Sequence, residues 1–323
     1  MKAEKEKSAP IAPQKIAVCI ATCRRPQGLR RLLEGLAVQT ISARPGFMVV
    51  VVDNDAGGSA RSVCDDFFRS VGFSSQYLIE PIPGIPQTRN RGVRFSLDFG
   101  ADLIAIIDDD EVPAPDWLER LERGMHEHGA HVVQGPVIPR FETAPPKWVI
   151  DGGFFDRQRF PTGTVRDIAA TNNVLIRRSV FDKIGFFDPK WGMMGGDDTH
   201  FFMRAVRAGF KIVFSNEAVV FEDHSPDRLK LGWLILRRFR YGNTRGFCEL
   251  EFLASYRHLI VVRDALLTIG RGTAGIILPW SRPFYKRFSS LLLAANGVGL
   301  LAALLGIRYR PYRKAHRTSI SAP

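Results

Sequence analysis

Four consecutive acidic residues close the segment IAIIDDDE at positions 104–111, namely Asp108, Asp109, Asp110 and Glu111. Neighbouring carboxylates repel one another, so a fold that keeps them together needs a positive partner. Carboxylate oxygens are the ligands that Mg²⁺ and Mn²⁺ prefer. In an extended segment Asp108 and Asp110 project to one side and Asp109 to the other. The cluster therefore predicts a divalent-cation site; the alternative is a solvated acidic turn that caps the next helix.

Two other segments carry acidic groups in settings that suit chemistry. GGDDTHFF places Asp197 and Asp198 at a glycine-flanked turn before a helix, where a carboxylate could act as a general base or as an N-cap. FEDHSPDR places His224 beside Glu222 and Asp223, where the imidazole could bind a metal. A lone histidine is more often an ordinary surface or core residue.

Arginine pairs could complement these acids. Arg24 and Arg25 follow the first apolar run, and Arg89 and Arg91 lie in PGIPQTRNRG. Either pair could clamp phosphate groups or lie on a solvated helix face. The residues alone leave both interpretations open.

The elements that must position these groups alternate along the chain. Short apolar runs predict strands at 15–23, 48–55, 74–80, 101–110 and 131–138, and periodic segments predict helices at 24–39, 59–71, 86–99 and 115–129. Such alternation predicts an α/β fold with a mostly parallel sheet flanked by helices. Ligands bind outside the carboxyl ends of such strands, where Thr22, Asp53, Asn54 and Asp108 fall.

The second half of this region is less regular. Residues 141–170 are rich in proline, glycine and aromatics and predict a long loop. Order resumes at 169–187, a helix is expected to open at Asp198, and a strand is expected at 211–216.

The C-terminal third differs in charge from the rest of the 323-residue chain. Residues 226–323 carry 17 Lys and Arg against 4 Asp and Glu, whereas residues 1–225 carry 28 against 29. Residues 288–307 contain no charge and are long enough to cross a bilayer. We therefore expect a basic, partly apolar helical region that contacts a membrane; the alternative is a buried helix pair of a soluble domain.

Residues 1–14 predict a disordered tail, and four scattered cysteines predict reduced thiols.

The ordered set IAVCIATCRRP, VVVVDND, PGIPQTRNRG, IAIIDDDEVPAPDWL, the TNN segment and GGDDTHFFMRA resembles the inverting family 2 glycosyltransferases of the GT-A fold. The match covers residues 15–225, and PPKW…GGFF is similar to the branch with succinoglycan-type glucosyltransferases. The resemblance implies a GT-A-like domain over 15–225; the membrane-associating region expected from charge and apolarity follows it over 226–323.

The resemblance also implies roles for individual residues. It places Asp198 as the catalytic base. The residues implied for nucleotide-sugar binding are Thr22, Arg24, Asp53, Asn54, Arg89, Asp108 and Asp109. The residues implied for metal binding are Asp110, Asp108 and His224. The residues implied on the acceptor side are Trp148, Asn172, Asn173 and Asp197.

Two departures from the family pattern matter. Asn54 stands where an acid is common in the family, which leaves open the nucleobase of the nucleotide-sugar donor. The QxxRW motif of processive synthases is absent after residue 225, where RRFRYGN stands, so transfer of a single sugar is expected.

The implied activity is the inverting transfer of one sugar from a nucleotide-sugar to a hydroxyl of a glycan or lipid-linked acceptor in surface polysaccharide biosynthesis. A UDP-sugar is the first candidate for the donor. Mg²⁺ or Mn²⁺ is the implied cofactor, and the implied location is the cytoplasmic face of the inner membrane, peripheral or single-span, against anionic lipid. A nucleotidyltransferase is the enzyme alternative, but no glycine- and lysine-rich phosphate loop lies between Ile20 and Leu29. An RNA-binding protein is the other alternative, but aromatics do not alternate with the basic residues of the tail, so no nucleic-acid partner is expected.

Overall fold

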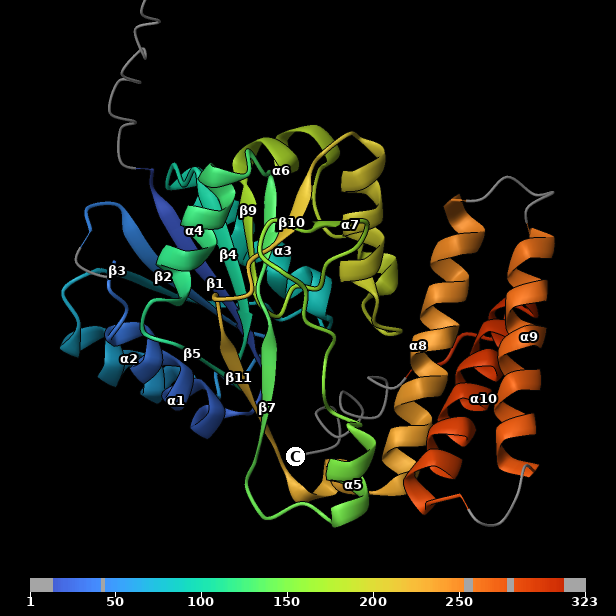
Figure 1. Cartoon of the computed structure of the whole chain (residues 1–323). Coiled ribbons are helices and arrows are strands. Elements are labelled where there is room, and N and C mark those ends of the chain that lie inside the picture. The colour runs from blue at the N-terminus through green and yellow to red at the C-terminus, as the bar shows by residue number, and fades with distance from the viewer. Residues whose placement is uncertain (1–13, 42–43, 253–257, 278–281, 311–323) are drawn as a thin grey trace, which may run out of the picture.

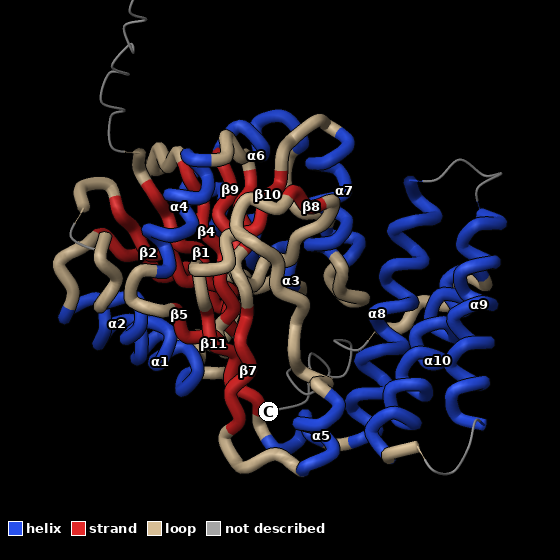
Figure 2. Tube along the Cα trace, viewed as in Figure 1, coloured by secondary structure: helices blue, strands red, loops and turns tan. Residues whose placement is uncertain are grey.

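The computed structural model describes residues 14–41, 44–252, 258–277 and 282–310. The expected disorder of residues 1–14 therefore falls almost wholly outside the described residues. A large sheet flanked by helices forms one side of the molecule, and three long helices stand beside it (Figures 1 and 2). The expected α/β architecture with a helical C-terminal region is confirmed.

The large sheet has eight strands, most of them parallel. In spatial order they are β3 (Ser74–Ile79), β2 (Phe47–Asp53), β1 (Ile16–Thr22), β4 (Leu103–Asp108), β9 (Val174–Arg177), β6 (Val132–Gln134), β10 (Ile212–Phe214) and β8 (Val165–Arg166). β9 and β8 run antiparallel to their neighbours. The four N-terminal strands are parallel, so their carboxyl ends meet at one edge.

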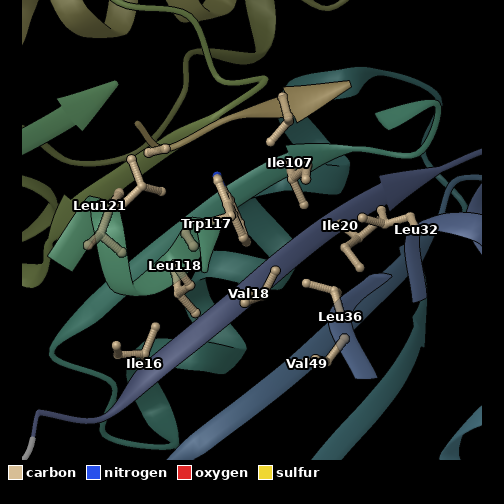
Figure 3. Packing of buried hydrophobic residues seen from close by; sticks show 14 of the residues in the cluster. Ile16, Val18, Ile20, Leu32, Leu36, Val49, Ile107, Trp117, Leu118 and Leu121 are labelled. Carbon is tan, nitrogen blue, oxygen red and sulfur yellow. The ribbon is translucent and has the colours of Figure 1, made fainter. Parts of the chain in front are cut away.

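Helices cover both faces of this sheet. They are α1 (Pro26–Ala37), α2 (Arg61–Ser70), α3 (Ile85–Asp98), α4 (Trp117–Glu127), α6 (Arg178–Ile184) and α7 (Asp197–Arg207). Successive side chains of a strand point to opposite faces. Accordingly Ile16, Val18 and Ile20 of β1 join a core with α1, α2 and α4, whereas Ala17 and Cys19 join a core with α3, α6 and α7. Figure 3 shows the part of the first core where β1 packs against α1 and α4.

The expected strand over 131–138 is wrong as a single element. The chain leaves the large sheet after β6 and enters a second sheet, ordered β5 (Glu111–Pro113), β11 (Val220–His224) and β7 (Val137–Phe141). The break falls at Gly135 and Pro136. Pro136 has no N–H to donate to a ladder, and a Cβ on Gly135 would lie 2.1 Å from the carbonyl oxygen of Ala218. The second sheet also makes 220–224 a strand.

The expected long loop over 141–170 contains a helix, α5 (Lys147–Gly152), besides the short strand β8. α5 has only six residues, too few to be stable alone. Its Trp148 packs against Phe288, far along the chain, with ring centroids 5.4 Å apart. The sequence missed this helix because its stabilising contacts are distant in sequence.

The C-terminal region consists of η2 (Pro226–Leu229), α8 (Leu231–Phe252), α9 (His258–Ile277) and α10 (Phe284–Leu304). α10 packs between α8 and α9. Among the described residues α10 alone is long and apolar enough to cross a membrane, and 44% of its most apolar stretch is buried inside the protein. The expected boundary at residue 225 and the expected membrane contact stay predictions.

Candidate active site

The polar groups at the strand ends do converge. Thr22 lies beside Asp53 in the register of β1 and β2, and Ala21 lies beside Asp108 in the register of β1 and β4. The three strands therefore deliver their terminal side chains to one edge of the sheet, as their parallel order dictates.

The positive partners of the acid cluster are arginines from separate elements. Arg25, at the start of α1, lies 3.0 Å from Asp109 and 3.2 Å from Asp110. Arg228, in η2, lies 2.7 Å from Asp110. Arg89, in α3, lies 3.2 Å from Asp108. These three arginines thus offset the repulsion among the carboxylates of Asp108, Asp109 and Asp110.

The expected alternation of the three aspartates is wrong. β4 ends at Asp108, and Asp109 and Asp110 form a turn. Arg25 contacts both of them, so they do not project to opposite sides. Strand periodicity applies only to extended backbone, which ends at Asp108, two residues before Asp110. Asp109 accepts a hydrogen bond from the Thr22 hydroxyl at 2.8 Å, and burial raises the pKa of Asp109 to about 6.

A second acidic layer lies beneath the cluster. Glu111 is buried, accepts from the backbone N–H of Asp108 at 3.0 Å and from the Asn172 amide at 3.0 Å, and has its pKa raised well above the usual value by burial. Glu222 pairs with Arg157 at 2.7 Å and with Arg228 at 3.1 Å. No role for Arg157 or Arg228 is predicted from the sequence, because each lies in a segment that only the fold brings to this edge.

His224 lies on β11, buried between the rings of Phe141 and Phe155. Burial and the nearby Arg228 lower its pKa to about 3, so the imidazole is neutral, as a metal ligand must be. The described residues contain no preformed group of three or more His, Cys, Asp or Glu side chains arranged around a metal. The carboxylates of Asp108 and Asp110 are the oxygen donors that a hard divalent cation prefers, and His224 would add an imidazole nitrogen; Asp110 is at the same time paired with arginines.

Asp198 differs from its neighbour Asp197 in its surroundings. Asp197 is buried and pairs with Arg89 at 2.6 Å, and the same arginine reaches Asp108. Asp198 is half-buried and has no ion-pair partner among the described side chains; its carboxylate accepts from the backbone N–H of Thr199 at 2.6 Å. Burial and the charge of Asp197 raise the pKa of Asp198 to about 6. A carboxylate in this setting can accept a proton near neutral pH.

We expect transfer to lose its rate as the pH falls through about 6 rather than through about 4, because a protonated Asp198 cannot accept a proton. The measurement is kcat with saturating donor between pH 4.5 and 8. Asp109 also titrates near 6, so nucleotide affinity must be measured over the same range. A rate limb near pH 4, with affinity constant, would contradict the assignment of Asp198.

The C-terminal region forms one wall of this site. Gly196 precedes α7 with a φ of +91°, and a Cβ there would lie 1.9 Å from Cγ2 of Thr244 in α8. Cys248, also in α8, is buried and has its pKa raised by burial and by the charge of Asp198. α8 therefore abuts the turn that carries the candidate base.

We expect Gly196→Ala to destabilise the protein by about 2–4 kcal/mol, because it combines a left-handed backbone with a steric overlap. Gly209→Ala is a matched control: φ is +87° there, and a Cβ would meet no atom within 4 Å. It should cost about 1 kcal/mol. Adding Thr244→Ser to Gly196→Ala should restore part of the loss in a urea titration. Equal losses for the two glycines would refute the close approach of α8.

The nucleotide-binding residues expected after β2 hold the local loops together. Asp53 is fully buried and accepts from Tyr77, Ser59 and the backbone N–H of Ala60. Asn54 donates to the carbonyl oxygens of residues 80 and 82 and accepts from the N–H of residue 84. Arg24, with a φ of +56°, pairs with Asp55 at 3.2 Å. Asp53 thus organises its own loop, and its expected contact with a nucleotide stays a prediction.

The residues expected on the acceptor side separate into different environments. Asp197 and Asn172 lie at the acid cluster, whereas Trp148 packs in an aromatic cluster under α10. Asn173 is fully buried and bonds to Trp117 and to the carbonyl oxygens of residues 136 and 218. The expectation of acceptor contact does not fit Asn173, whose side chain ties the two sheets together.

Two buried polar atoms at the site have no hydrogen-bond partner among the described residues, Nε of Arg89 and Oδ1 of Asn172. Buried polar atoms are nearly always satisfied. Unsatisfied ones beside an acid cluster at strand ends are therefore consistent with a polar ligand. Arg89 is expected among the nucleotide-binding residues. In the structure it bridges Asp108 of the acid cluster and Asp197 of the turn that carries Asp198.

This arrangement, an α/β sheet with acids at its strand ends and the Asp197–Asp198 turn beside them, is that of a GT-A-like glycosyltransferase. The chain is similar in fold to a Staphylococcus aureus TarS fragment, residues 1–349, solved with UDP (TM-score 0.51, 15% identity, 92% of this chain and 93% of that one). It is also similar to the mannosyltransferase PcManGT of Pyrobaculum calidifontis (TM-score 0.56, 18% identity, 95% and 84%).

The chain belongs to glycosyl transferase family 2. The model described as "Glycosyl transferase family 2" matches residues 17–185, and "Glycosyl transferase family group 2" matches residues 103–306. The succinoglycan biosynthesis protein ExoM of Rhizobium meliloti is 33% identical over 91% of this chain and 94% of its own length. Glycosyltransferase AglE of Haloferax volcanii is 25% identical over 70% and 71%. The resemblance drawn from the motifs is confirmed.

Proposed function

We propose that this glycosyltransferase transfers one sugar from a nucleotide-sugar, UDP-sugar first, to a hydroxyl of a glycan or lipid-linked acceptor in surface polysaccharide biosynthesis, with inversion at the anomeric carbon. The observation that carries the proposal is the bridge of Arg89 between Asp108 and Asp197. One guanidinium connects the acids expected to face the diphosphate with the turn that presents Asp198. The catalytic base Asp198 and a bound diphosphate would thereby be positioned relative to each other.

Asp198 takes the proton of the acceptor hydroxyl as its oxygen attacks the anomeric carbon. The bond from that carbon to the diphosphate breaks on the opposite side, and the nucleoside diphosphate leaves. An attack in line from one side inverts the configuration and needs no covalent intermediate. Arg25 and Arg228, already directed at Asp109 and Asp110, can balance charge that develops on the diphosphate.

A bound Mg²⁺ or Mn²⁺, held by Asp108, Asp110 and His224, would act as a Lewis acid toward the diphosphate. The three donors lie at one edge of the fold, and His224 is neutral. Glu222 lies 3.8 Å from Nδ1 of His224 and is a further carboxylate at the same place.

Relatives' names support the acceptor class. One relative is a succinoglycan biosynthesis protein, and another is the glucosyl-dolichyl phosphate glucuronosyltransferase of Haloferax volcanii, 24% identical over 73% of this chain and 77% of its own length. A lipid-linked acceptor places the enzyme at the cytoplasmic face of the inner membrane. The basic excess of residues 226–323 suits the anionic surface found there.

The test is a thermal-shift series with UDP, GDP, ADP and TDP, each with and without Mn²⁺. Solved structures of this fold hold UDP in one case and GDP-Man with Mn²⁺ in another, so both bases belong in the series. We expect a shift that depends on both the base and the metal, with UDP largest. No shift with any nucleotide would contradict the proposal. If a nucleotide shifted the melting temperature equally with and without Mn²⁺, the role proposed for the cation would be wrong.

A further inference from the structure

α9 exposes five large apolar side chains on one side. The exposed α9 face consists of Leu259 (74% exposed), Ile260 (37%), Leu266 (57%), Leu267 (48%) and Ile277 (81%). Leu259 and Leu266, like Ile260 and Leu267, are seven residues apart and so share a side of the helix. The opposite side of α9, with Val261 and Ala265, is buried against α10. Such a row of apolar groups marks an interaction surface.

α10, although it is the most apolar helix, is not free to leave the protein. A Cβ on Gly242 of α8 would lie 1.9 Å from the carbonyl oxygen of Asn296 in α10. A Cβ on Gly272 of α9 would lie 2.5 Å from the backbone nitrogen of Ala294, also in α10. The three backbones are therefore in close contact, and Asn296 donates to the carbonyl oxygen of Arg238 at 3.2 Å. Crossing a bilayer with α10 alone would break these contacts.

Positive charge lies within and beside the exposed α9 face, since Arg263 is four residues from both Leu259 and Leu267 and so shares their side of the helix. Arg263 (66% exposed side chain) and the exposed Arg271 lie on α9 itself, and the exposed Arg282 and Lys286 lie near its C-terminal end. Asp264 offsets part of this charge through its 2.8 Å pair with Arg263. A symmetric dimer through this face would bring the arginines of two copies together. Anionic lipid would instead receive both the basic groups and the apolar side chains.

We propose that the exposed α9 face lies in the surface of an anionic membrane as an interfacial helix, and that α10 is the packed centre of the three-helix unit and does not span. The inference rests on the proposed function only for its purpose, which is to keep the enzyme near a lipid-linked acceptor. The contact surface itself follows from the exposed residues of α9 and the packing of α10.

The experiment is co-sedimentation of the full-length chain with phosphatidylcholine vesicles that contain no phosphatidylglycerol or 30 mol% of it. Leu266→Ser is compared with Leu236→Ser, a matched change in α8, where the leucine is 52% exposed. We expect Leu266→Ser to weaken binding to anionic vesicles and Leu266→Ser/Leu267→Ser to weaken it at least tenfold, which is about 1.4 kcal/mol. Leu236→Ser should stay within about twofold of the parent. Neutral vesicles should bind less.

Several outcomes would overturn the inference. Unchanged binding of the double variant, or an equal loss with Leu236→Ser, would remove α9 from the membrane contact. Protein that resists alkaline carbonate extraction would point to a spanning α10. A dimer that the double variant converts to a monomer, without vesicle binding, would make a second copy the occupant.

The same variants separate this inference from the proposed function. We expect Leu266→Ser/Leu267→Ser to keep the parent's thermal shift with UDP and Mn²⁺, because α9 does not contribute to the acid cluster. If no nucleotide shifts any variant while vesicle binding depends on α9, the proposed function fails and the inference stands. If nucleotides bind and vesicles do not, the inference fails and the proposed function stands.

Discussion

Asp198→Asn should lower the transfer rate by roughly 10²–10⁴, the usual contribution of a positioned base, while nucleotide binding changes little. The amide has the same shape and its oxygen can still accept from the N–H of Thr199, a bond of 2.6 Å in the parent. It cannot take the proton of the acceptor hydroxyl. Because Asp198 has no ion-pair partner among the described side chains, its charge can be removed without leaving an arginine unbalanced. The measurements are kcat and the dissociation constant of the nucleoside diphosphate.

Asp197→Asn is the matched control for this prediction. It makes the same chemical change one residue earlier, but it removes half of the 2.6 Å pair with the buried Arg89. A buried charge that loses its partner costs stability. We therefore expect Asp197→Asn to lower the melting temperature and to disturb nucleotide binding. If Asp198→Asn behaved in this way, and Asp197→Asn lost only turnover, the two roles would have to be exchanged.

Asp110→Ala should weaken metal-dependent nucleotide binding by at least about 100-fold, since even residues around metal ligands change affinity by 10–100-fold. The fold should survive, because Arg25 keeps Asp109 and Arg228 keeps Glu222 as partners. Binding without metal should hold or improve, since both arginines gain freedom to meet a phosphate. The measurement is the affinity for UDP by calorimetry, with Mn²⁺ and with EDTA.

Asp223→Ala is the control for the loss of one negative charge in the same region. Asp223 is the neighbour of Glu222 and His224 on β11, but its carboxylate pairs with Arg31 and Arg140 at 3.0 Å each. Strand alternation directs it away from the acid cluster. Affinity for UDP with Mn²⁺ should therefore stay near that of the parent. Unchanged affinity in Asp110→Ala, or an equal loss in Asp223→Ala, would exclude Asp110 as a metal ligand.

How far the sequence predicts this protein can be judged from particular elements. The bounds predicted for the N-terminal strands and helices agree with the structure within a few residues, because the strands are continuous apolar runs that end in polar residues and the helices have clear helical periodicity. The splitting of 131–138 between two sheets was not predicted, since the obstacle to a continuous strand is partly the carbonyl oxygen of Ala218, more than 80 residues away. α5 was missed for the same reason, because its stabilising aromatic partner lies in α10.

The candidate site divides in the same way. Residue type and position at strand ends were enough to bring together Thr22, Asp53 and Asp108, because parallel strands deliver their carboxyl ends to one edge. The sequence could not separate side chains that face a ligand from those that hold the loops. Asn173 and Asp53 look like binding residues by motif, yet both are fully buried and hydrogen-bonded to the protein.

The sequence alone determined the family, the order of the N-terminal elements and the acids at their ends, because these follow from local periodicity and from motifs in a fixed order. Only the tertiary structure decided which cations meet the acids: Arg25, Arg89, Arg157 and Arg228 come from four separate segments. It also decided that α8 closes the turn at Gly196 that precedes Asp198, and that α9 keeps apolar side chains exposed while its opposite side packs on α10. Ion pairs and close backbone contacts depend on distances in space. Spacing along the sequence does not give these distances for residues on different helices and strands.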